Sequence, residues 1–242
     1  MNGAAPRQPW LAPGRMAAAL EGSQRPASVA LAAADGSARE FHGAGSHGSD
    51  LLPLLAAELA GRGLGAGSLQ RLVVGLGPGS FTGLRVVSAQ AQGLAHALGL
   101  EPLGLPSIEA RLYGALEPGD TGLLLADARG GLFTLGRYAR LPSGIEPLEA
   151  VAAAPAPETL ERLRRWAREA GPGPRRRWFA EAGAVSALGP PAVDLPAFEP
   201  APAASALALL SLAQARFETQ GPGAFAGPQP LYLAEFWVRP RR

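Results

Sequence analysis

Residues 74–85 read VGLGPGSFTGLR, and this stretch decides the fold because it joins a strand to a helix through a glycine-rich loop. The apolar run at 71–76 predicts the strand. Ser80 is a favoured N-cap residue, so a helix is predicted from 80 to 98, where Gly99 ends it. A strand, a tight loop and a helix in this order are typical of an α/β protein.

The loop itself allows two interpretations. Gly77 and Gly79 let the backbone turn sharply and come close to another chain or a ligand. Ser80 and Thr82 lie at the helix start, where free backbone N–H groups attract anions, and Arg85 follows one turn later. These five residues therefore form a candidate anion-binding or docking loop. Alternatively, the glycines only make a tight joint. A Walker loop is excluded, because the spacing differs and the chain has no Lys.

Apolar periodicity and turn residues predict alternating strands and helices along the rest of the chain. Further strands are predicted at 16–21, 28–34, 37–42, 101–104, 122–126, 131–139 and 177–180. Further helices are predicted at 50–62, 106–115, 157–170 and 203–219. This order indicates an α/β protein of two lobes, and no internal sequence repeat relates them.

The same pattern suggests where the lobes begin and end. We expect a first lobe at 16–105, completed by the helix near 203–219, and a second lobe at 106–242. Residues 1–15 hold three prolines and no apolar segment of signal-peptide length, so they are expected to form a disordered extension. No apolar run approaches the roughly 18–20 residues of a membrane span, and the expected location is the cytoplasm.

The composition excludes several kinds of catalytic site. The 242 residues include no Cys, so disulfides, thiolate metal sites and cysteine nucleophiles are excluded. All 22 basic residues are Arg, which excludes a catalytic or Schiff-base lysine, and Asn2 is the one asparagine. The pI is about 9.6, but the net charge is only +2. Few groups titrate between neutrality and that pI, so it is weak evidence for nucleic-acid binding.

The segment GLGPGSFTGLRV at 75–86 resembles the signature of the bacterial TsaB family, also called YeaZ. Other segments that resemble this family follow along the chain in the expected order. They are ALEGSQRPASVAL at 19–31, HGSDLLPLL at 47–55, LPSIEA at 105–110, Asp127-Ala128-Arg129 and PLYL at 230–233. The resemblance covers about 16–140 well, and residues 141–229 match weakly.

This resemblance implies a fold and a role. TsaB-like proteins have the actin/Hsp70-type (ASKHA) fold of two RNase-H-like lobes. They are paralogues of the catalytic subunit TsaD and pair with it through helices of the first lobe. Together with TsaE they support transfer of threonylcarbamoyl to adenosine 37 of tRNA. The expected function is therefore a non-catalytic partner subunit that requires no cofactor, with ATP or ADP as a candidate ligand at an interface of the complex.

The titratable residues agree with a role without catalysis. The metal site of the catalytic paralogue needs two histidines four residues apart, whereas His42, His47 and His96 are spaced differently. Glu21 and Asp127 lie at predicted strand ends, where this fold class holds Mg²⁺–ATP through carboxylates. We interpret these two residues as vestigial or structural acids. No catalytic and no metal-ligating residue is predicted.

The predicted partner surface lies on the helices at 50–62 and 80–98. Alanine and glycine recur around the second helix, and small residues let another helix approach closely. The surface predicts a contact with TsaD, or a homodimer when TsaD is absent. The expected interface residues are Leu52, Ala56, Val86, Ala89 and Ala97.

Two other functions fit parts of the sequence. An autonomous ATPase or small-molecule kinase would need Glu21, Asp127 and the loop at 77–82 to converge on a nucleotide. An RNA-binding module would use the arginine-rich segment 162–177 together with Trp166 and Trp178. Such a segment is more often a solvated helix face with its tryptophans in the core. We therefore expect tRNA to be bound mostly through the complex.

Overall fold

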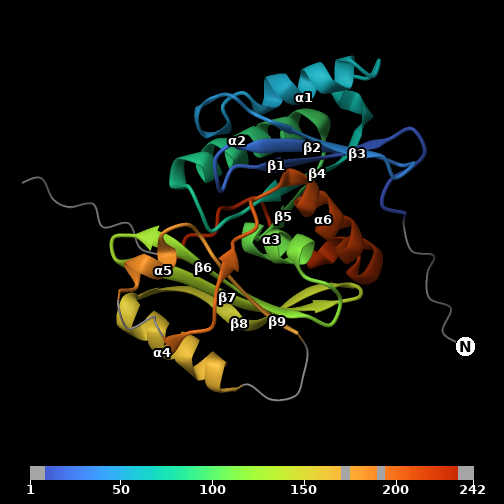
Figure 1. The fold of residues 1–242 in the computed structure, drawn as a ribbon. Helices are drawn as coiled ribbons and strands as arrows, with labels where there is room; N and C mark the ends of the chain where they lie inside the picture. Colours follow the sequence, from blue (N-terminus) through green and yellow to red (C-terminus); the bar gives the residue numbers. More distant parts are fainter. Residues whose placement is uncertain (1–8, 170–174, 190–193, 234–242) are drawn as a thin grey trace, which may run out of the picture.

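Two five-stranded sheets and six α-helices form the part of the chain that the computed structural model describes, residues 9–169, 175–189 and 194–233. The elements lie in layers (Figure 1). Helices α1 (Leu51–Ala60) and α2 (Phe81–Leu98) cover the outer face of the first sheet. Helices α3 (Ser107–Ala115) and α6 (Ala206–Gln220) fill the space between the sheets, and α4 (Ala156–Arg168) covers the outer face of the second sheet.

The first sheet has the strand order β3-β2-β1-β4-β5. Strands β1 to β3 form an antiparallel meander, and β4 and β5 run parallel to β1. All six residues of β1 are buried because helices cover both faces of the sheet. The strands are β1 (Met16–Glu21), β2 (Ser28–Ala33), β3 (Ala38–His42), β4 (Leu69–Gly75) and β5 (Pro102–Leu105).

The second sheet has the strand order β10-β9-β6-β7-β8. Again three strands form an antiparallel meander, and the last two run parallel to the first strand of the set. The short helix α5 (Ala184–Ala187) connects β9 with β10. The strands are β6 (Thr121–Arg129), β7 (Leu132–Leu141), β8 (Gly144–Pro155), β9 (Arg176–Ala180) and β10 (Glu199–Pro200).

The two lobes are therefore repeats of one topology. Each consists of a three-stranded meander, a helix, a parallel strand, a second helix and a last parallel strand. The sequence contains no internal repeat, because the two halves share the order of their strands and helices but not the residues that form them. Two sheets of this kind with helices packed on their faces give the predicted two-lobed α/β fold.

Each lobe ends in a helix that packs on the sheet of the other lobe. Helix α3 follows β5 but contacts β6, β7 and β8, whereas α6 follows β10 but contacts β1, β2 and β4. Alanines at 17, 19 and 30 let α6 lie close to the first sheet. The amide of Ala206 donates to Glu40 Oε1 at 2.7 Å and to Ser28 Oγ at 3.1 Å, which fixes the start of α6.

The structure confirms most of the predicted elements and adds some that the sequence does not indicate. Ser80 caps α2 by accepting from the amide of Gly83 at 3.2 Å, and Gly99 ends the helix in the left-handed region at φ 63°. Strand β8 is not predicted. It is an edge strand, which tolerates Pro147 and an alanine-rich end that local strand preference disfavours.

The expectation of a disordered extension over residues 1–15 is wrong for residues 9–15. Trp10 and Leu11 are buried between the sheets, and the Trp10 ring meets the edge of Phe217 on α6 at 5.3 Å. The amide of Ala12 donates to Gln70 Oε1 at 2.8 Å. Proline content alone is therefore a poor predictor of disorder in this segment, because the burial of Trp10 and Leu11 anchors it. Residues 1–8 lie outside the described residues.

None of the described helices is long and apolar enough to cross a lipid bilayer. This agrees with the absence of a long apolar run in the sequence.

Replacing Trp10 by Ala should destabilise the protein by about 3–5 kcal/mol, because the change removes a large side chain packed between the sheets. Urea unfolding followed by circular dichroism measures this loss. Leu148→Ala is the matched control, since the Leu148 side chain is 43% exposed and its loss should change little. Equal unfolding midpoints for Trp10→Ala and the parent protein would show that the segment before β1 is not part of the fold.

Candidate functional site

A cleft with a volume of about 930 Å³ lies between the two lobes. It is bordered by the ends of β1 and β4 from the first lobe and of β6 and β9 from the second. Both predicted landmarks, the glycine loop and the turn at Asp127, line it. The lining residues include 23–25, His47, 78–82, Ile108, Arg111, 126–129, Thr134, Glu181 and 231–233.

The glycine loop packs against the turn that follows β1. The amide of Ser80 donates to the carbonyl oxygen of Ser23 at 2.7 Å. A Cβ atom at Gly79 would approach Ser23, and one at Gly83 would approach the carbonyl oxygen of Gly22, each closer than the 3.0 Å that real Cβ atoms keep. The two glycines are thus needed because two backbones touch.

The other side of the loop is held by α3. The amide of Gly77 donates to Ser107 Oγ at 3.0 Å, and the amide of Ser107 donates to the Gly77 carbonyl at 2.7 Å. Leu76 accepts a hydrogen bond of 2.7 Å from the amide of Leu231. Of the two interpretations of the loop, this geometry favours the tight joint, since the amide of Ser80, the cap of α2, already has a carbonyl partner.

Arg85 lies on the exposed side of α2 near the cleft. Its guanidinium packs over the Phe81 ring at 4.0 Å, and its Nε donates to Tyr232 Oη at 3.3 Å. The rings of Phe81 and Tyr232 also lie 5.5 Å apart. Arg85 therefore links α2 to the segment at 230–233, a contact that the sequence spacing does not indicate. Thr82 is exposed and lines the cleft.

Glu21 is a buried acid at the end of β1. Its Oε1 accepts from the amide of Ser23 at 2.6 Å, and its Oε2 has no hydrogen-bond partner among the described residues. Burial raises the pKa of Glu21, and the neighbouring Ser23, Ser107 and Arg111 oppose that shift only in part. Glu21 is 2% exposed and does not line the cleft. Its position does not fit a ligand to a metal–nucleotide complex in this cleft.

Asp127 occupies the corresponding strand end in the second lobe. It is exposed, lines the cleft and accepts from the amide of Arg129 at 2.7 Å. Arg129 has a φ of 67°, so this hydrogen bond stabilises a strained turn. The structure therefore places only one of the two predicted acids in the cleft.

A polar network across the cleft was not predicted from the sequence. The side chain of Gln24 donates to Glu181 Oε1 at 2.6 Å and accepts from the amide of Ala204 at 2.8 Å. Arg111, buried on α3, forms an ion pair of 2.9 Å with the same Glu181 oxygen and donates to the Pro202 carbonyl at 2.7 Å. These partners are far apart in sequence, so no local signal reveals them.

The histidines do not gather into one site. His47 bonds to the guanidinium of Arg25 beside the cleft, His42 ends β3, and His96 is exposed on the last turn of α2. Among the described residues, no group of three or more His, Cys, Asp or Glu side chains could hold a metal ion.

The predicted interface residues lie on the outer surface of α1 and α2, with different exposure. Ala56, Ala89 and Ala97 are exposed, whereas Leu52 and Val86 are half-buried. Leu52 also packs against the apolar core beneath the helices. The surface that another protein could touch is therefore made mainly of small side chains.

Two RNase-H-like lobes of the same topology around a cleft define the actin/Hsp70 class of protein. In line with this, YeaZ from Pseudomonas aeruginosa has a similar structure, with a TM-score of 0.70 and 25% identity over 90% of this chain and all of that chain. A family described as TsaD, tRNA N6-adenosine threonylcarbamoyltransferase, matches residues 43–198. The chain therefore belongs to this family, as a protein of the TsaB/YeaZ type.

Individual relatives match part of the chain. It is 36% identical to the tRNA threonylcarbamoyladenosine biosynthesis protein TsaB of Escherichia coli over 110 residues. The matched region covers 43% of this chain and 48% of the relative. It is 37% identical to an uncharacterised protein of Mycobacterium tuberculosis over 123 residues. This matched region covers 47% of this chain and 57% of the relative. The chain thus spans about half the length of these curated relatives.

Gly83→Ala should destabilise the protein by about 1–3 kcal/mol, because the added methyl group would push the turn after β1 away from α2. Gly93→Ala is the matched control on the same helix. A Cβ atom at Gly93 meets nothing within 4 Å, so this change should leave stability unchanged or raise it by up to about 1 kcal/mol. Thermal and urea unfolding measure both. Equal effects of the two changes would contradict the close backbone contact.

The pH dependence of stability should reveal the burial of Glu21. Because its pKa is raised, the folded protein keeps a proton that the unfolded chain releases. The free energy of unfolding therefore falls as pH rises from the ordinary value of 4.5 through the raised pKa, with a slope of at most about 1.4 kcal/mol per unit.

Glu21→Gln removes this ionisation, so its stability relative to the parent protein should grow as pH rises over that window. Urea unfolding of both proteins between about pH 4.5 and 8 checks this. Burial also raises the pKa of Glu109, but that residue is common to both proteins and its contribution cancels. A difference that stays constant with pH would rule out a buried, ionising Glu21.

Proposed function

We propose that this chain is a non-catalytic subunit that binds a TsaD protein and supports the transfer of threonylcarbamoyl to adenosine 37 of tRNA. Two findings support this role. The chain belongs to the family described as TsaD, and relatives at 36% and 39% identity are named tRNA threonylcarbamoyladenosine biosynthesis protein TsaB.

The main structural support for the proposal is that the glycine loop serves as a tight joint between β4 and α2. The amide of Ser80 is occupied by the Ser23 carbonyl, and Ser107 holds Gly77 from the other side. Glu21 is sealed beneath this contact. The loop and the acid thus support the architecture of the lobe, and Glu21 cannot face a nucleotide in the cleft together with Asp127. The geometry therefore favours a scaffold over an autonomous ATPase or kinase.

The surface available for a partner lies on α1 and α2. These helices form the outer layer of the first lobe, on the side away from the second sheet (Figure 1). Ala56, Ala89 and Ala97 are exposed there, and a helix of TsaD could approach such small side chains closely, at about 8 Å between axes. Without TsaD, the same surface would pair two copies of this chain.

The proposal includes the rest of the assembly. TsaE would join the complex of the two paralogues, and tRNA would be bound mostly through that complex in the cytoplasm. ATP or ADP would bind at an interface of the complex, since Glu21 is sealed away from the cleft of this chain. Transfer would therefore require TsaD, and the purified chain with threonylcarbamoyl adenylate and tRNA should give no modified tRNA.

Charged substitutions on α2 test the partner surface. Ala89→Arg and Ala97→Arg should each abolish binding to TsaD, because an arginine would be forced into a dehydrated helix contact. Size-exclusion chromatography with light scattering measures the complex. Thermal stability of the chain alone should change by less than about 0.5 kcal/mol, since both residues are exposed.

Ala187→Arg is the matched control, because Ala187 is exposed on α5 of the second lobe. This variant should bind TsaD as the parent protein does. If the α2 variants bind TsaD with unchanged affinity, α2 is not the interface. If the unaltered chain modifies tRNA alone, the proposal of a non-catalytic subunit is wrong.

A further inference from the structure

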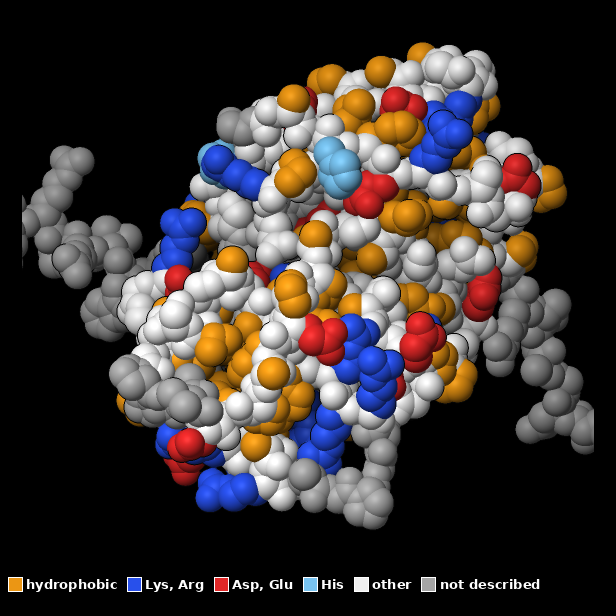
Figure 2. Space-filling view, in the orientation of Figure 1, with side chains coloured by type: hydrophobic (Ala, Val, Ile, Leu, Met, Phe, Trp, Pro, Cys, Tyr) orange, Lys and Arg blue, Asp and Glu red, His pale blue; other side chains and the backbone are white. Residues whose placement is uncertain are grey.

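Helix α4 presents an arginine-rich face to solvent at the end of the molecule opposite α1 and α2 (Figure 1). Its apolar side packs on the second sheet through Leu160, Leu163 and Trp166, all buried. The remaining positions of the helix carry mostly charge. Figure 2 shows blue arginine side chains along the lower edge of the molecule, over this helix.

The positive charge of the chain is concentrated in this segment. Residues 156–176 include six arginines and three glutamates, an excess of three positive charges. The whole chain has a net charge of only +2, so all other residues together carry a net charge of −1. The small net charge therefore hides a basic surface on an otherwise slightly acidic protein.

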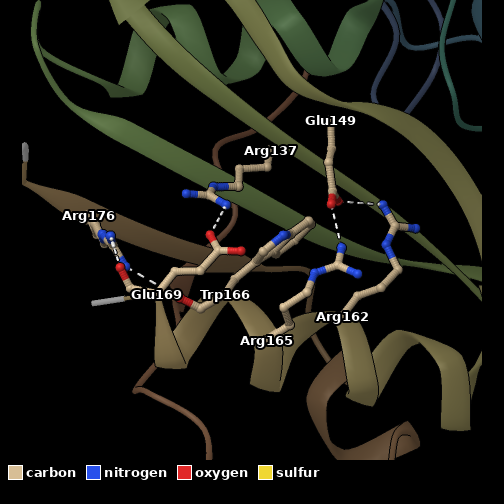
Figure 3. A network of polar contacts seen from close by, with 7 residues as sticks. All are labelled: Arg137, Glu149, Arg162, Arg165, Trp166, Glu169 and Arg176. Carbon is tan, nitrogen blue, oxygen red and sulfur yellow. Dashed lines mark hydrogen bonds and ion pairs between the residues drawn. The ribbon is translucent and has the colours of Figure 1, made fainter. Parts of the chain in front are cut away.

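The nearby acids do not neutralise this surface. Glu149 on β8 is shared by two guanidinium groups, pairing with Arg162 at 3.1 Å and also with Arg165 (Figure 3). Arg176 donates to the backbone carbonyls of Trp166 at 3.3 Å and Glu169 at 2.7 Å, and these contacts involve no carboxylate. One carboxylate for two cations leaves a positive charge that water or an anion must balance.

Towards the end of α4, charge is more exposed. Arg168 on the last turn of the helix is exposed. Arg165 keeps 52% of its side chain accessible despite its contact with Glu149. A guanidinium that is exposed and partly oriented can donate to phosphate oxygens without first breaking a buried ion pair.

The tryptophans of the segment cannot take part in stacking with bases. Trp166 is 2% exposed and Trp178 is 8% exposed. Arg137 and Arg162 also pack over the Trp166 ring, at 5.5 and 5.4 Å. The described part of this segment therefore offers no aromatic platform of the kind that single-stranded RNA binders use, and Arg165 and Arg168 reach solvent through their guanidinium groups.

We propose that the basic face of α4, with Arg165 and Arg168, binds the phosphate backbone of RNA and does not read bases. The identity of that RNA as tRNA rests on the proposed function. Because α4 and α2 lie at opposite ends of the molecule, an RNA on α4 and a protein on α2 can be bound together. Binding by phosphate contacts alone is tolerant of sequence and depends steeply on salt.

The test uses the full chain without partner proteins and an unmodified tRNA transcript. Fluorescence anisotropy measures affinity at several salt concentrations near 0.1 M. The double variant Arg165→Glu/Arg168→Glu should weaken binding on the order of tenfold and reduce the slope of log affinity against log salt by about 2. The double variant Arg39→Glu/Arg62→Glu is the matched control, with the same change in net charge on the first lobe.

The control variant should bind RNA as the parent chain does, and an unrelated RNA hairpin of similar length should bind as tightly as the tRNA. The inference is overturned if the unaltered chain binds no RNA, if both double variants lose affinity equally, or if binding depends on base identity. Its failure is separable from that of the proposed function, since TsaD binding through α2 is measured without RNA and with α4 intact.

Discussion

The first lobe depends on a contact between two backbones, in which the turn after β1 rests directly on the start of α2. The amide of Ser80 donates to the Ser23 carbonyl, and glycine at 79 and 83 leaves no side chain between the two segments. The same turn carries Gln24 to the second lobe, where it meets Glu181. The close approach of residues 22–23 to residues 79–83 thus sets where the glycine loop and the buried Glu21 lie. Through Gln24, the same turn also links the two lobes.

This contact also accounts for the position of Glu21 outside the cleft. The two meander turns, one in each lobe, line the cleft. In the first, the acid is turned inward and sealed, and in the second, Asp127 is engaged by its own turn. Two carboxylates that do not face one another cannot share a divalent cation, which prefers several oxygen ligands at once. The outer helices α1 and α2 remain accessible, which is consistent with the proposed role.

Local patterns predicted much of this fold, and contacts between distant residues account for the rest. Periodicity and turn residues suffice to predict the cap at Ser80, the end of α2 at Gly99 and the succession of most strands and helices along the chain. All of these depend on neighbours in sequence. The burial of Trp10 depends on Phe217, and the link between Gln24 and Glu181 spans 157 residues. The role of the glycine loop depended on which segment would lie against it. That is decided by tertiary packing, and the sequence left both a joint and an anion site open.

The exchange of helices between the lobes has a consequence for biosynthesis. The strands of the first sheet are complete once residue 105 has been made, but α6, which covers its inner face, begins at residue 206. At roughly 5–20 residues per second, the ribosome needs about 5–20 s to supply those missing residues. During that interval the alanine-lined face of the sheet has no covering helix. The first sheet can therefore acquire its inner covering only after α6 in the second half of the chain has been made.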